Sequence, residues 1–341
     1  MPLTAFYTAS LKAYSKLMSS LKLLKGVVYF LLFCLGSTIL PESYSQNSTL
    51  TLPKSTNKTP DSYTLYEHPG RMIRLPRGNL LSLYCEGKGE PTIMLETGFG
   101  GGAYAAWYRL EPRLAKITRT CSYDRAGYGF SELGNDLPRD LYHDVSDLYG
   151  LLKASGEPAP YILVGHLDGG HIIGAFADSH PQEVAGLVFL DAAVLVDKQQ
   201  VEGTKEKPSP SLQKHFSNQF QQIRTCLKCA EKSAGHLEAR PGDYCLDSEK
   251  VKRLPPDMAK ALIEISSRPD SWRAFLSEAE QHYLVDDDSW EVSLLPHRWQ
   301  EIPILVFTAS VASLDDAHSA AAYGLPPSDH KAIEAARTGR K

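Results

Sequence analysis

Short apolar runs alternate with amphipathic stretches between residues 67 and 195. The apolar runs predict strands buried on both faces of a sheet, because their hydrophobic residues are nearly continuous. They cover residues 80–87, 92–98, 118–127, 161–166 and 184–193. The amphipathic stretches carry apolar residues at helical spacing and cover residues 104–117, 142–158 and 169–181. This alternation predicts an α/β fold with a mainly parallel central sheet and helices on both faces.

The rhythm breaks in the second half of the chain. Residues 196–299 are polar and predict helices at residues 209–224, 256–266 and 270–283. One more apolar run, at residues 302–310, predicts a buried strand. A long helical insertion between two strands is typical of a lid or cap over the strand ends. We therefore expect the sheet domain to comprise residues 67–195 and 300–341, with residues 196–299 as a lid.

The first 45 residues are set apart from this pattern. Residues 1–25 contain four lysines and no acidic residue, and residues 26–40 are uncharged and mostly apolar. A basic start followed by about 15 apolar residues predicts a secretory signal peptide. A retained membrane anchor is the alternative, since a span needs about 20 residues. We expect an exported protein, anchored only if the segment is uncleaved, with residues 46–66 as a flexible linker.

Composition and charge narrow the range of partners. The chain has 341 residues, 43% of them hydrophobic, and a formal net charge of -4. No basic run is interleaved with aromatic residues, so we expect no nucleic acid partner.

The spacing of Cys226, Cys229, Cys245 and His236 does not match a standard zinc site, so no metal is expected. In an exported protein a disulfide is the better reading, with Cys245 paired to either Cys226 or Cys229.

Three glycine-rich turns then follow in a fixed order. They are ETGFGGG at residues 96–102, YDRAGYGFS at 123–131 and GHLDGG at 165–170, and each follows a predicted strand. Together with the helical insertion, these motifs resemble those of the α/β-hydrolase superfamily, in particular its small esterase-like members. The resemblance implies hydrolase ancestry, a small ester-like or amide ligand and no cofactor.

In that superfamily a sharp strand-to-helix turn, the nucleophile elbow, presents the catalytic nucleophile at the centre of G-x-nucleophile-x-G. The matching residue in this chain is Leu167, which has no lone pair with which to attack. The resemblance places the oxyanion-stabilising backbone N–H groups at Asp168 and at either Phe99 or Gly100. The Asp168 carboxylate is an alternative nucleophile, one residue after the expected position.

The resemblance also implies positions for the acid and the histidine of the catalytic triad, and only the acid has a candidate. Asp315 follows the strand after the insertion, where the acid of the triad is expected. Neither a further apolar strand nor a GH turn follows Ser310, so we expect the last strand and the catalytic histidine to be missing. The same fold places the strands of Cys85 and Cys121 side by side and favours a disulfide between them. We therefore expect impaired catalysis, with an active hydrolase using Asp168 and a non-catalytic binding protein as alternatives.

Overall fold

A seven-stranded sheet lies at the centre of the computed structural model, which describes residues 62–135, 137–192, 210–233, 235–283, 299 and 301–307. The strand order is β1-β2-β4-β3-β5-β6-β7. The strands are β1 (Arg71–Arg74), β2 (Leu80–Glu86), β3 (Thr92–Glu96), β4 (Thr120–Tyr123), β5 (Tyr161–His166), β6 (Val184–Leu190) and β7 (Ile304–Phe307).

The sheet is mainly parallel, which confirms the predicted fold class. The first two strands form an antiparallel pair, and β2 is also antiparallel to β4. From β4 through β3, β5 and β6 to β7, every neighbouring pair is parallel. All five residues of β3 are buried, as expected for a strand covered on both faces. The loops after β3, β4 and β5 therefore begin at the same edge of the sheet.

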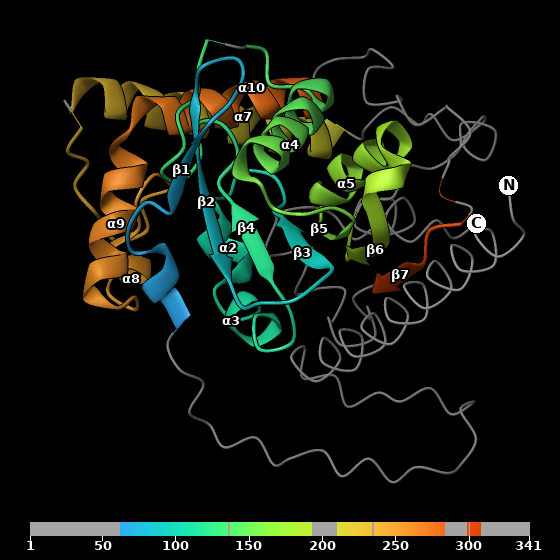
Figure 1. Ribbon diagram of the computed structural model, residues 1–341. Helices are drawn as coiled ribbons and strands as arrows, with labels where there is room; N and C mark the ends of the chain where they lie inside the picture. The colour runs from blue at the N-terminus through green and yellow to red at the C-terminus, as the bar shows by residue number, and fades with distance from the viewer. Residues whose placement is uncertain are drawn as a thin grey trace, which may run out of the picture. The chain divides into compact units, whose positions relative to one another are not determined.

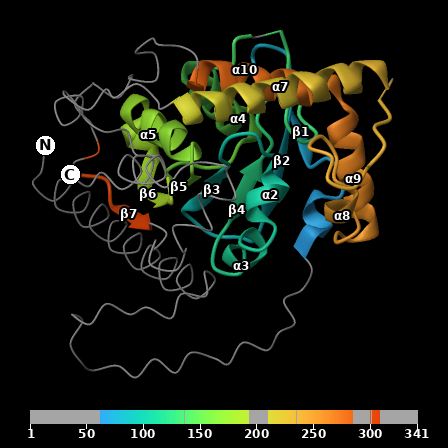
Figure 2. The same cartoon turned by 180° about the vertical axis from the view of Figure 1, so that it is seen from behind.

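Helices cover both faces of the sheet. Figures 1 and 2 show α4 (Leu141–Ser155) and α5 (Gly169–Ser179) over one face, and α2 (Ala103–Trp107) and α3 (Glu111–Leu114) over the other. Leu148, Leu151 and Phe176 of α4 and α5 are fully buried in the main core, together with Leu163 of β5. Asp140 caps α4 by accepting a hydrogen bond from the backbone N–H of His143 at 2.9 Å. The apolar faces of these helices thus build the core that fixes the strand ends.

One helix prediction is wrong, because a single helix was expected where the structure has two. Residues 104–117 were expected as a single helix, whereas the structure divides them into α2 and α3. Pro112 lies in the first turn of α3, where its missing N–H costs no helical hydrogen bond. In the interior of one long helix the same residue would remove a bond and clash with the preceding turn.

The insertion between β6 and β7 is helical over its described residues. It contains α7 (Pro210–Lys232), α8 (Ser248–Val251), α9 (Pro256–Ser267) and α10 (Pro269–Tyr283). In both views α7 and α10 run side by side, and Phe220, Ile223 and Trp272 are buried between them and their neighbours. This packing gives the insertion a small apolar core of its own.

The structure contains two disulfides among its described residues. One joins Cys85 of β2 to Cys121 of β4, residues that lie directly opposite each other in the register. The other joins Cys226 to Cys245, so it confirms one of the two pairings left open by the sequence and contradicts the other, Cys229 with Cys245. Cys229 is exposed with a free thiol, whereas Cys226 is fully buried in the apolar core of the insertion. Burial distinguishes the two thiols, because Cys245 packs against the same apolar cluster that contains Cys226.

Several sequence expectations fall on residues outside the described ranges. They include the signal or anchor segment at 1–45, most of the linker at 46–66, Asp315, and the strand and histidine expected to be missing after Ser310. The end of the linker is described, and it forms a short 3-10 helix, Ser62–Tyr66, in which Tyr66 is buried. No helix within the described ranges is long and apolar enough to cross a membrane.

Candidate active site at the turn between β5 and α5

The turn between β5 and α5 has the backbone geometry of a nucleophile elbow. The strand ends at His166 and the helix begins at Gly169. A Cβ atom on Gly165 would lie 2.6 Å from the Gly169 carbonyl oxygen, and one on Gly169 would lie 2.5 Å from the Glu96 carbonyl oxygen. Both distances exclude any larger residue without a shift of backbone. The two glycines are therefore needed for the close approach of strand, helix and the neighbouring β3.

Leu167 lies at the centre of this turn, in a left-handed backbone conformation with φ of 49°. That region costs an ordinary L-residue roughly 1–2 kcal/mol, and a bulky apolar residue rarely occupies it. The Leu167 N–H donates to the Leu190 carbonyl oxygen at 3.3 Å and ties the turn to the end of β6. The chain therefore keeps the strained turn but carries a hydrocarbon side chain where nucleophilic chemistry needs a heteroatom.

Asp168 occupies a different position from the expected nucleophile. Its backbone is already helical, with φ of -63° and ψ of -22°, and it immediately precedes α5. Its carbonyl oxygen accepts a hydrogen bond from the His171 N–H at 3.0 Å, as in the first turn of a helix. Burial is the main cause that raises the pKa of Glu278, and the negative charge of the Asp168 carboxylate adds to it.

The glycine-rich loop after β3 meets the insertion at Gly100. This residue has φ of 73°, and its N–H donates a long hydrogen bond of 3.5 Å to Glu278 Oε2 of α10. The ring of Phe275 lies so close that a Cβ on Gly100 would be 2.6 Å from it. Phe275 also packs edge-on against Phe99, with ring centroids 4.9 Å apart. The expected oxyanion donor at Gly100 is thus directed at a carboxylate of the insertion.

A buried arginine organises the strand ends around this loop. Arg125, which follows β4, is 3% exposed, and its guanidinium contacts carboxylates on two elements. Nη1 lies 3.1 Å from Glu96 Oε1, and Nη2 lies 2.6 Å from Glu278 Oε1. The same nitrogens donate to the carbonyl oxygens of Thr97 at 2.5 Å and Gly98 at 3.1 Å. Arg125 therefore holds β3, the glycine-rich loop and α10 together.

Burial dominates the electrostatics of this cluster. It raises the pKa of Glu96 to about 7, although Arg125 and the hydrogen bond from the Tyr123 hydroxyl act in the opposite direction. It also raises the pKa of Glu278, against the attraction of Arg125 and the hydrogen bond from the Tyr128 hydroxyl. Each carboxylate has a charged partner and at least one tyrosine donor, whereas the buried Nε of Arg125 has no hydrogen-bond partner among the described residues.

The motif at residues 123–131 is explained by the capping role of Asp124. Its carboxylate accepts hydrogen bonds from the Ala103 N–H at 2.8 Å and the Phe130 N–H at 3.0 Å. A Cβ on Gly129 would lie 2.1 Å from that carboxyl group. Asp124 therefore fixes both the start of α2 and the loop after β4, and the glycine gives it room.

The structure brings together only part of the predicted site. Leu167, Asp168 and Gly100 lie on loops at one edge of the sheet, close to Glu278 and Arg125, whereas Asp315 lies outside the described residues. Sequence reasoning missed Arg125 and Glu278. One signal was available for Glu278, because it lies three residues after Phe275 on the apolar side of α10. An acidic residue in such a position predicts a buried partner.

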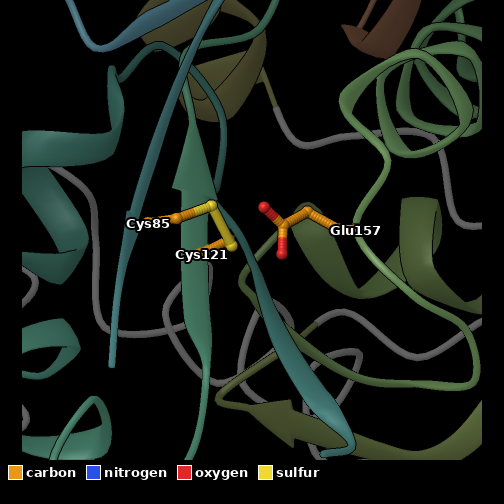
Figure 3. A group of neighbouring side chains, drawn as sticks. All are labelled: Cys85, Cys121 and Glu157. Carbon is orange, nitrogen blue, oxygen red and sulfur yellow. A yellow bond between two sulfur atoms is a disulfide. The ribbon is translucent and has the colours of Figure 1, made fainter. Parts of the chain in front are cut away.

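One group of potential metal ligands occurs among the described residues, and it lies elsewhere in the sheet. Cys85, Cys121 and Glu157 each offer a ligand atom within 4.8 Å of the others (Figure 3). The two sulfur atoms are bonded to each other, so they offer no thiolate. The Glu157 carboxylate binds the Arg119 guanidinium at 2.8 Å. The arrangement is a disulfide beside an ion pair and belongs to the structural part of the sheet.

Comparison with known proteins agrees with this architecture. Residues 91–323, which are about two thirds of the chain, match the family model described as alpha/beta hydrolase fold. The chain is 36% identical over 127 residues to 2-hydroxymuconate semialdehyde hydrolase of Pseudomonas sp. (strain CF600), covering 36% of this chain and 44% of that protein. It is 31% identical over 115 residues to the uncharacterized protein YbdG of Bacillus subtilis (strain 168), covering 33% and 35%.

These matched regions span less than half the length of both curated relatives. Among solved structures, a haloalkane dehalogenase from Agrobacterium tumefaciens is similar, with 18% identity, a TM-score of 0.47, and coverage of 70% of this chain and 77% of that one. The family match rests on the same segment that supplies the parallel strands, the elbow and the glycine-rich loop. The chain belongs to the alpha/beta hydrolase fold family.

Proposed function

We propose that this protein descends from ester or amide hydrolases and is itself impaired in hydrolysis, because Leu167 replaces the nucleophile. The observation that carries the proposal is the left-handed φ of Leu167 on an intact elbow. The turn retains the form that serves a nucleophile, while its side chain has neither an attacking lone pair nor a proton to exchange. In a well-studied serine protease, removal of the nucleophile lowers turnover by about a million-fold.

The surroundings of Gly100 support the same proposal. An oxyanion hole stabilises negative charge that develops in the transition state, through backbone N–H groups in a site that excludes water. Here the Gly100 N–H points to the Glu278 carboxylate, which repels a developing oxyanion when it is ionised. Glu278 is held there by Arg125 and by the Tyr128 hydroxyl. Productive binding of a tetrahedral intermediate at Gly100 would require this carboxylate to move or to be protonated.

An active hydrolase that uses Asp168 is the weaker alternative. Asp168 has ordinary helical backbone angles, whereas an elbow nucleophile is projected by a strained conformation. That conformation belongs to Leu167. Asp168→Asn provides the test, since loss of measurable hydrolysis in this variant alone would favour Asp168 as the nucleophile.

A non-catalytic binding role for a small ester-like molecule is the second candidate. A cavity of about 350 Å³ between the loops of the sheet and the insertion favours it. Such a volume lies at the lower end of the range of small-molecule sites. Binding does not depend on a nucleophile, so this role is compatible with Leu167 at the elbow.

The decisive experiment compares the unaltered protein with Leu167→Ala and Leu167→Ser on a panel of p-nitrophenyl esters and with a fluorophosphonate probe. We expect no covalent labelling of the unaltered protein, and equal, background-level hydrolysis for it and the alanine variant. Leu167→Ser restores the missing oxygen, and a gain in this variant alone would show that the rest of the site is competent. Turnover typical of esterases, or labelling of the unaltered protein, would overturn the proposal.

We also propose that the protein is exported. The two disulfides support this, since disulfides form and persist in oxidising compartments and are rare in the cytosol. The proposal is tested by determining the N-terminus of the mature protein and its cellular fraction. A full-length chain with four alkylatable thiols at these positions in the cytosol would contradict it.

A further inference from the structure

The insertion places one carboxylate among a group of donors that belong to the sheet domain. Glu278 of α10 is 4% exposed, and its two oxygens meet donors from the loops after β3 and β4. Arg125 Nη2 donates to Oε1 at 2.6 Å. The Tyr128 hydroxyl and, at 3.5 Å, the Gly100 N–H both donate to Oε2. Three donors from two loops therefore converge on a single carboxylate of a third element.

These donors are positioned by contacts that do not involve the insertion. Glu96 at 3.1 Å and two backbone carbonyl oxygens of the glycine-rich loop fix the Arg125 guanidinium. The Tyr128 ring packs against the same guanidinium, with 5.3 Å between Arg125 Cζ and the ring centroid. The Tyr128 N–H also donates to the Arg125 carbonyl oxygen at 2.9 Å. The sheet domain thus builds an arrangement suited to a carboxylate, a guanidinium with hydroxyl and amide donors, and the insertion supplies the carboxylate.

Other contacts hold α10 on the sheet loops independently of Glu278. Arg268, directly before the helix, donates to two backbone carbonyl oxygens of the loop after β4, at 2.5 and 2.6 Å. Within the helix, Ser277 Oγ accepts from the backbone N–H of Arg139 at 2.8 Å. Truncation of the Glu278 side chain should therefore leave α10 in place and open a small buried space beside Arg125.

We propose that Arg125, Tyr128 and the Gly100 N–H form a binding site for a short aliphatic carboxylate, which the insertion occupies with its own Glu278. The side chain of Glu278 is then an internal inhibitor, because it fills the place that a free carboxylate would take. The buried guanidinium favours a carboxylate over a neutral molecule of the same shape, since hydrogen bonds between charged groups are the stronger ones. The inference concerns binding alone and holds whether or not the elbow is active.

The size of the ligand follows from the side chain that it replaces. Glu278→Ala removes Cγ and the carboxyl group, which together have the heavy atoms of acetate. Acetate bound in the space left behind can meet the same guanidinium, hydroxyl and amide donors as Glu278. Nitromethane has the same planar shape without the charge, and it has no hydrolysable bond. The two compounds therefore separate recognition of charge from simple filling of a void.

Thermal unfolding of the full chain carrying Glu278→Ala tests the site, with sodium acetate or nitromethane at pH 7 and constant ionic strength. We expect acetate to raise the melting temperature of the variant saturably, by about 3 °C or more at about ten times its Kd, and nitromethane to raise it by much less. The unaltered protein should show no saturable response, because Glu278 fills the site. A folded variant that does not respond to acetate, or an equal response to acetate in the unaltered protein or to nitromethane in the variant, would refute the proposal.

Two further variants locate the bound acetate. Glu280→Ala is the matched control, because it also removes a carboxylate of α10 that binds an arginine, Arg224 at 3.0 Å. The side chain of Glu280 is 38% exposed, so water occupies the vacated position and no saturable response to acetate is expected. Tyr128→Phe, added to Glu278→Ala, removes one donor and should weaken acetate binding by about two- to ten-fold. Unchanged affinity in this double variant would place acetate elsewhere and overturn the proposal.

If Glu278→Ala is unfolded without a ligand, the comparison is made on the yield of folded protein after dilution from urea. Acetate, and not nitromethane, should raise this yield for Glu278→Ala and leave that of Glu280→Ala unchanged. A yield that acetate does not raise would contradict the proposal. Since no step depends on cleavage of a substrate, a hydrolytically active elbow would overturn the proposed function and leave this inference standing.

Discussion

Replacing Glu111 by glutamine should remove a large part of the pH dependence of stability. Glu111 begins α3 and is fully buried, with no basic residue bound to it. Its Oε2 atom accepts hydrogen bonds from the Tyr66 hydroxyl and from Ser122 Oγ at 2.5 Å, while Oε1 has no partner among the described residues. Burial raises the pKa of this carboxyl group to about 8, despite both hydrogen bonds. At neutral pH the folded protein therefore holds Glu111 protonated.

The sign of the effect follows from which state holds the proton. Below pH 4.5, the ordinary pKa of the group, folded and unfolded chains are both protonated and Glu111 causes no pH dependence. Between pH 4.5 and about 8 the unfolded chain loses the proton and the folded chain keeps it, so stability falls as pH rises. At about 1.4 kcal/mol for each pH unit, the full loss is about 5 kcal/mol.

The assay is urea unfolding of the unaltered protein and of Glu111→Gln at several pH values from 5 to 8.5. Glutamine keeps the shape and the acceptor oxygen but cannot ionise. We expect similar stability near pH 5, and a variant that is more stable by several kcal/mol at pH 8.5. Glu264→Gln, which removes an exposed carboxylate from α9, serves as the control and should follow the unaltered protein. A difference between the Glu111 variant and the unaltered protein that stays constant across this range would refute the reasoning.

Three further predictions concern the sheet ends and the insertion. Arg125→Met leaves two buried carboxylates without their cation and should cost about 3–5 kcal/mol in urea unfolding at pH 8. Cys226→Ser opens a disulfide that spans 19 residues and should cost about 3 kcal/mol, whereas Cys229→Ser should unfold like the unaltered protein; equal losses in both would contradict the pairing. Gly129→Ala places a Cβ against the Asp124 carboxyl group and should lower the melting temperature by more than Gly156→Ala, which has similar backbone strain (φ 74°) in open space.

Local pattern was sufficient to predict six of the seven strands, but not β1 (Arg71–Arg74), which is mostly exposed and carries two arginines. Buried parallel strands are nearly continuous apolar runs, and those at residues 161–166 and 184–193 of the prediction correspond to β5 and β6. The elbow was predictable for a related reason, because Gly165 and Gly169 are required by backbone contacts that any such turn makes. The position of Leu167 in that turn follows from spacing alone. The contact of Gly165 with Gly169 lies within the turn itself, whereas Gly169 also approaches the Glu96 carbonyl oxygen of β3, which is distant in the sequence.

Only the tertiary structure decided what surrounds the elbow. Glu278 and Arg125 are separated by 153 residues, and their ion pair depends on how the insertion packs on the loops of the sheet. The choice of Cys226 over Cys229 was equally open in the sequence, because it depends on which side of α7 faces Cys245. The cavity between the sheet loops and the insertion is likewise built from loops and helices far apart in the chain. Sequence spacing determines backbone form over short distances, whereas the partner of a buried charge or thiol is decided by packing between distant segments.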